Sequence, residues 1–90
     1  MSSIALVDDE QSILTSVSLS LESEGFKVDT FLNGVEALEA LESKPYDLGL
    51  FDIKMPKMDG NELLSKIRSS KIEKLKELPI IFLTSKDHEQ

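Results

Sequence analysis

The sequence contains no cysteine and no tryptophan, and it has one tyrosine and one histidine among its 90 residues. Without cysteine the chain can form no disulfide bond, no thiolate zinc site and no cysteine nucleophile. No apolar run approaches the roughly 20 residues that span a bilayer, and the N-terminus lacks the pattern of a signal peptide. These absences favour a cytoplasmic protein that makes no contact with a membrane.

Positive charge is also scarce, because 10 lysines and arginines stand against 17 aspartates and glutamates and leave a net charge of −7. A protein that neutralises nucleic-acid phosphates needs a cationic face, so we expect no nucleic-acid binding by this segment. The length of 90 residues fits one small domain, and the apolar fraction of 40% suits a globular fold.

Short apolar runs alternate with helical patterns along the chain, which is typical of an α/β fold with a parallel sheet. Gly25 is placed to end the first helix and Asn33 to cap the second, in which Val35, Leu38 and Leu41 are expected to face the core. The charged stretch 71–78 has no definite assignment. The expected strands are 3–8, 26–31, 47–51 and 80–83, and the expected helices are 10–24, 34–43 and 61–70.

Polar side chains follow three of the expected strands. Asp8 and Asp9 follow the first, Asp52 follows the third, and Thr84 and Ser85 follow the fourth. Because the carboxyl ends of parallel strands converge on one crevice, we expect these side chains to meet there. Clustered carboxylates suit a hard cation such as Mg²⁺. A carboxylate can also accept a phosphoryl group, with a nearby metal ion and hydroxyl to balance the phosphoryl charge.

Three segments, Ile4–Glu10, Asp47–Gly60 and Pro79–Ser85, resemble the receiver domains of two-component response regulators. The resemblance covers the whole chain, and the middle segment is the most specific of the three. It implies a doubly wound, flavodoxin-like parallel sheet with strand order 2-1-3-4.

The resemblance also implies a role for each matching residue. Asp52 would be the phosphoacceptor. Thr84 would donate a hydrogen bond to the phosphoryl group and move on activation, with Ser85 in the small-residue position beside it. The implied ligands of Mg²⁺ are Asp8, Asp9, Asp52 and the backbone carbonyl of Lys54.

The function that this resemblance implies is a phosphorylation-dependent signalling switch. A sensor histidine kinase would supply the phosphoryl group, and the switch would regulate an output, expected to be transcription through a DNA-binding domain. The sequence around Asp52 and Thr84 is most similar to that of receivers that are joined to winged-helix domains. Such a chain would not be an enzyme beyond promoting its own phosphorylation and slow dephosphorylation.

The chain differs from complete receivers at its C-terminal end. The fifth strand with its lysine and switch aromatic, and the last helices, have no counterpart, so residues 1–90 are expected to form an incomplete receiver without its output domain. Ile80–Leu83 would then be an edge strand that is apolar on both faces. We therefore expect self-association through this edge, by strand pairing or by exchange of elements between chains.

Two alternatives remain open at this point. A haloacid-dehalogenase-type phosphohydrolase also uses an aspartate nucleophile at a strand end with Mg²⁺, but it needs a second aspartate two residues later, where this sequence has Lys54. An interaction domain that is inactive because it is truncated is the other alternative. The presence of Asp8, Asp9, Asp52 and Thr84 argues against a degenerate site in the parent protein.

Overall fold

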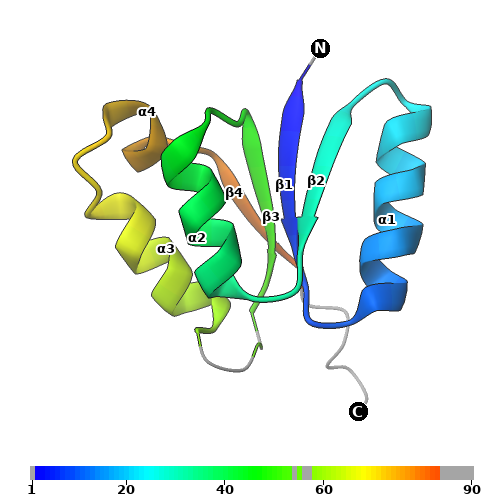
Figure 1. The fold of residues 1–90 in the computed structure, drawn as a ribbon, viewed down its shortest axis with the longest axis horizontal. Coiled ribbons are helices and arrows are strands. Elements are labelled where there is room, and N and C mark those ends of the chain that lie inside the picture. Colours follow the sequence, from blue (N-terminus) through cyan, green and yellow to red (C-terminus); the bar gives the residue numbers. More distant parts are fainter. Residues whose placement is uncertain (1, 54, 56–57, 84–90) are drawn as a thin grey trace.

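The computed structural model describes residues 2–53, 55 and 58–83, which form a parallel sheet with helices on both faces (Figure 1). The order of the strands across the sheet is β2-β1-β3-β4, as the sequence predicted, so the flavodoxin-like class is confirmed. The strands are β1 (Ser3–Val7), β2 (Lys27–Phe31), β3 (Leu48–Asp52) and β4 (Ile80–Leu83).

The helices cover the sheet unequally. Figure 1 shows α1 on one face and α2 and α3 on the other, with the short α4 leading into β4. None of the helices in the described part of the chain is long and apolar enough to cross a membrane. The helices are α1 (Gln11–Ser23), α2 (Gly34–Ser43), α3 (Gly60–Arg68) and α4 (Glu73–Lys76).

The helix ends follow the chemistry of their terminal residues. Gly25 has a φ angle of +97°, a conformation that ends α1 and that side chains with a Cβ rarely adopt. Asn33 Oδ1 accepts a hydrogen bond of 2.9 Å from the backbone N–H of Glu36, which confirms the predicted cap of α2. Asp59 caps α3 in the same way, through a 2.9 Å bond from the N–H of Glu62. The helix therefore begins one residue earlier than the sequence predicted.

The core lies in two layers, one on each face of the sheet. Phe51, Leu63 and Ile67 are fully buried between the sheet and the helices α2 and α3. Leu6 of β1 and Leu14 of α1 are buried on the other face, in the layer between the sheet and α1. Since alternate residues of a strand point to opposite faces, the apolar run of β1 supplies both layers at once.

The predicted position of Val35 in the core is wrong. Its side chain is 44% exposed, whereas Ala37 and Leu41 of the same helix are buried. Ala37 and Leu41 are four residues apart and so lie on one side of the helix, which here is the side toward the sheet. Val35 lies a little over half a turn before Ala37 and therefore points away from it.

Strand β4 is the edge of the described sheet next to β3. Its register with β3 places Ile81 beside Leu50 and Phe82 beside Phe51. Phe82 packs against the core layer of α2 and α3, but Ile81 points to the α1 face and is 53% exposed. The α1 face is thus less completely covered at β4 than the opposite face.

A polar network joins β2 to the end of α2. The Tyr46 hydroxyl donates a 2.6 Å hydrogen bond to Asp29 Oδ2, and Lys44 Nζ lies 3.0 Å from the same oxygen. The hydrogen bond from Tyr46, followed by that from Lys44, holds the pKa of Asp29 below its ordinary value. Burial, and then the Asp29 carboxylate, raise the pKa of Tyr46. The network fixes the loop that leads into β3.

The change Tyr46→Phe is expected to lower the free energy of unfolding by about 1 kcal/mol near neutral pH, because it removes a hydrogen bond to a charged group that is partly solvent-screened. Since the folded pKa of Asp29 is depressed, its contribution is complete above the unfolded value near 3.8 and is lost as the pH falls through the folded value. The difference between wild type and variant should therefore shrink in acid. Urea unfolding at a series of pH values measures it, and a difference that stays constant into strong acid would contradict the assignment.

A candidate metal centre at the carboxyl edge of the sheet

Three aspartates meet where β1 and β3 end. Asp8 and Asp9 directly follow β1, and Asp52 is the last residue of β3. The two strands are neighbours in the sheet, with Val7 beside Phe51. One carboxylate oxygen from each aspartate lies within 4.8 Å of the others. The topology of the sheet therefore brings together acids that are more than 40 positions apart in the sequence.

The three acids differ in exposure. Asp8 is 1% exposed and Asp52 is 2% exposed, whereas Asp9 lies on the surface. Asp8 is also oriented, because its Oδ1 accepts a 2.9 Å hydrogen bond from the backbone N–H of Glu10. The site thus has two buried carboxylates at its base and a third, that of Asp9, on its solvent-exposed side. A hydrated cation can approach from this exposed side.

Gly60 allows the first turn of α3 to pack against the end of β3. A Cβ atom at this position would lie 2.8 Å from the Asp52 carbonyl oxygen and 2.9 Å from Ile53 Cα, distances that side chains do not tolerate. The Gly60 N–H donates a 2.8 Å hydrogen bond to the Ile53 carbonyl. Met58, earlier in the same loop, is buried in the core layer of α2 and α3. The start of α3 is therefore packed closely against the end of β3.

The donor set fits a hard divalent cation. Carboxylates this close together repel one another, and burial of two of them strengthens the repulsion, so a cation would relieve it. Mg²⁺ keeps several of its water ligands and needs only one or two carboxylates from a protein. The exposed position of Asp9 leaves room for such waters.

Other predicted members of the site lie outside the described residues. These are Thr84 and Ser85, assigned to the phosphoryl group, and Lys54, whose carbonyl was assigned to the metal. Sequence reasoning also missed the part of Glu10, whose backbone N–H orients Asp8. An aspartate that precedes a helix by a few residues often accepts such a bond from the N–H two positions later, so the pattern was available.

Comparison with known proteins decides the family. The model of the response regulator receiver domain matches residues 4–90. The chain belongs to this family. Receivers are signalling modules of response regulators, so the alternative of a haloacid-dehalogenase-type phosphohydrolase is not supported.

Relatives of this receiver include transcriptional regulators. The alkaline phosphatase synthesis transcriptional regulatory protein PhoP of Bacillus subtilis is 41% identical over 86 residues, which are 96% of this chain and 34% of PhoP. The receiver thus spans about a third of the length of the curated relatives that it matches.

Solved structures of similar receivers have the same fold. The response regulator TrrA of Thermotoga maritima in complex with Mg²⁺-BeF is 41% identical, with a TM-score of 0.85 over 94% of this chain and 70% of that one. TrrA has also been solved in complex with the histidine kinase ThkA, where the match has a TM-score of 0.85 and 41% identity and covers 98% of this chain and 72% of that one.

Proposed function

We propose that this receiver accepts a phosphoryl group on the carboxylate of Asp52, with Mg²⁺ held by Asp8, Asp9 and Asp52. The observation that carries the proposal is the convergence of the three carboxylates within 4.8 Å at the ends of β1 and β3. Asp52 lies at the base of the cluster and Asp9 at its solvent side. The proposal keeps the remaining family assignments, namely the Lys54 carbonyl as a metal ligand, Thr84 as the hydrogen-bond donor to the phosphoryl group and Ser85 beside it.

The donor in this proposal is a phosphorylated histidine of a sensor kinase. An Oδ atom of Asp52 attacks phosphorus, the P–N bond to the imidazole breaks, and the released nitrogen takes a proton. The hydrogen bond from Glu10 holds Asp8 in place. Mg²⁺, when bound, offsets the charge of the transferring group. The complex of TrrA with a histidine kinase, and its complex with Mg²⁺-BeF, support both the partner and the ion.

The process that this receiver regulates is proposed to be transcription. Several relatives are transcriptional regulatory proteins, among them PhoP and a CpxR homologue of Haemophilus influenzae. We therefore propose that phosphorylation of residues 1–90 controls an output domain that acts on transcription in the cytoplasm. DNA contact would belong to that output domain, because the receiver segment has a net charge of −7. The receiver itself would only promote its own phosphorylation and slow dephosphorylation.

Labelling with a small phosphodonor tests the proposal. Incubation with acetyl phosphate and Mg²⁺ should add the mass of one phosphoryl group, which alkali removes as it does from an acyl phosphate. Removal of Mg²⁺ with EDTA should prevent labelling, and Asp9→Asn should raise the Mg²⁺ concentration needed on the order of tenfold. Glu39→Gln, an equal change at an exposed carboxylate of α2, is the matched control. Labelling that is independent of Mg²⁺, or equal in the two variants, would refute the metal assignment.

We also propose that the β4 edge of this chain associates with a second copy. Ile81 is 53% exposed on this edge strand, and exposed apolar edges favour strand pairing. Light scattering over a dilution series should give a mass that falls at low concentration. Ile81→Lys should produce a monomer at all concentrations, whereas Leu19→Lys, which changes a 62% exposed leucine of α1, should not. A wild-type monomer at high micromolar concentration would contradict the proposal.

A further inference from the structure

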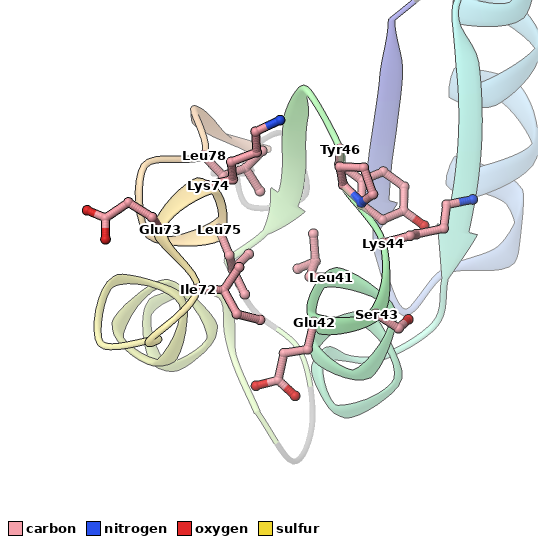
Figure 2. A pocket seen from close by; sticks show the side chains of 11 residues that line it. Leu41, Glu42, Ser43, Lys44, Tyr46, Ile72, Glu73, Lys74, Leu75 and Leu78 are labelled. Carbon is pink, nitrogen blue, oxygen red and sulfur yellow. The ribbon is translucent and has the colours of Figure 1, made fainter.

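A hollow of about 440 Å³ lies between the end of α2, the loop that follows it, and α4 (Figure 2). It is at the amino end of the sheet, because α4 and the start of β3 lie at the opposite end of the molecule from the end of β3 (Figure 1). The aspartate cluster takes no part in its lining. We call it the α2–α4 pocket.

The floor of the α2–α4 pocket is apolar. Leu41, Leu75 and Leu78 line it and are between 3% and 5% exposed. Ile72 lies on the wall with 44% of its surface exposed and extends the apolar lining toward solvent. The volume is within the range of about 300–1,000 Å³ that small-molecule sites occupy. The pocket therefore offers a small ligand continuous apolar contact.

Charge is distributed unevenly around the rim. Lys44 is engaged by Asp29 at 3.0 Å, and Glu73 lies 3.9 Å from Lys76. Lys74 lines the pocket and, within the part of the chain that the structure describes, forms no ion pair. Figure 2 shows the carboxylates of Glu42 and Glu73 directed away from the ammonium group of Lys74. The rim thus presents one available positive charge next to an apolar floor.

The wall formed by α4 is held in place before any ligand arrives. Arg68 Nη1 donates hydrogen bonds of 2.8 Å to the carbonyl of Lys76 and 2.9 Å to that of Leu78. Ser70 Oγ accepts a 3.0 Å bond from the N–H of Ile72 at the start of α4. A preformed wall reduces the entropy lost when a ligand binds.

We propose that the α2–α4 pocket binds a small carboxylic acid with an aromatic or alkyl body. The body lies on Leu41, Leu75 and Leu78, and the carboxylate pairs with Lys74. The size of the pocket selects a small molecule, and the single available ammonium group selects a monoanion. The ligand joins α2 to α4, and α4 leads directly into β4, the strand whose last residue, Leu83, pairs with Asp52.

Titration with 2-naphthoate, followed by amide NMR on the purified protein, tests this site. The amide signals of residues 41–44, 46 and 72–78 should shift together and saturate. The neutral analogue 2-naphthalenemethanol should bind several-fold more weakly. Shifts confined to β4 and α1 would place the ligand on the open α1 face and overturn the proposal. Light scattering in the same samples should show no change of mass, since a rise on binding would indicate that a second copy forms the site.

Two variants separate the apolar and charged contributions. Lys74→Glu should weaken binding of 2-naphthoate roughly three- to tenfold and leave 2-naphthalenemethanol unaffected. Lys71→Glu, an equal change at an exposed lysine outside the pocket, is its control. Ile72→Gln should weaken both compounds about fourfold, unlike Leu19→Gln on α1. Equal effects of Lys74→Glu and Lys71→Glu would show that net charge alone is responsible, and would overturn the site.

Discussion

Asp52→Asn is expected to abolish phosphoryl incorporation, because the amide keeps the shape of the carboxylate and has no anionic oxygen to attack phosphorus. The wild-type protein should gain one phosphoryl mass from acetyl phosphate, and the variant none. The loss should be complete, because the other buried carboxylate of the cluster, Asp8, is held by a hydrogen bond from the backbone N–H of Glu10. Intact-mass spectrometry measures the result.

The variant must be shown to fold. Circular dichroism and urea unfolding provide this control, and Glu39→Gln again serves as a carboxylate-to-amide change that leaves the site intact. A phosphoryl mass that persists in Asp52→Asn, with an alkali-labile bond, would place the phosphoacceptor elsewhere. Peptide mapping of the wild-type label distinguishes Asp52 from Asp8 and Asp9 directly.

Phe51→Ala is expected to have the largest effect on stability. Phe51 is fully buried at the centre of the core layer between the sheet and the helices α2 and α3. Removal of a buried phenylalanine ring costs about 3–5 kcal/mol, through lost apolar contact and the cavity that remains. The total stability of a small domain is about 5–15 kcal/mol, so the variant should be largely unfolded on mild heating or in low urea.

Phe26→Ala is the matched control for this change. Phe26 precedes β2 and is 37% exposed, so the same deletion should cost less, about 1–2 kcal/mol. Urea unfolding followed by circular dichroism compares both variants with wild type. Nearly equal midpoints for Phe51→Ala and Phe26→Ala would mean that the core is not centred on Phe51.

The sheet and the acid cluster could be predicted because local pattern and topology agree. Apolar runs mark the strands, and the positions of Gly25 and Asn33 mark helix ends. The convergence of strand ends then places Asp8 beside Asp52 without any tertiary detail. Strand β3 nevertheless includes Asp52, one residue beyond its predicted end, because it pairs with Leu83.

Features that depend on packing between distant segments could not be predicted. Helix α4 is only four residues long, and Leu75 is buried there within a charged stretch that has no clear period. Val35 satisfies the helical spacing but points outward. The hydrogen bond between Tyr46 and Asp29 joins residues that are 17 positions apart, and neither residue type indicates which partner it has in the fold. Leu75 and Tyr46 line the α2–α4 pocket, so the pocket could not be predicted from the sequence either.

The pairing of β1 with β3 determines at which stage of folding the aspartate cluster forms. Ser3 and Asp47 are 44 positions apart and are joined by a hydrogen bond, so the strands around the site come together only after a long loop has closed. In a chain in which β1 and β3 have not paired, Asp52 lies apart from Asp8 and Asp9, so the proposed metal site does not exist. Ions that bind the assembled cluster also stabilise the native state by mass action. Under the proposed function, phosphorylation would therefore be restricted to molecules in which this long-range pairing is complete.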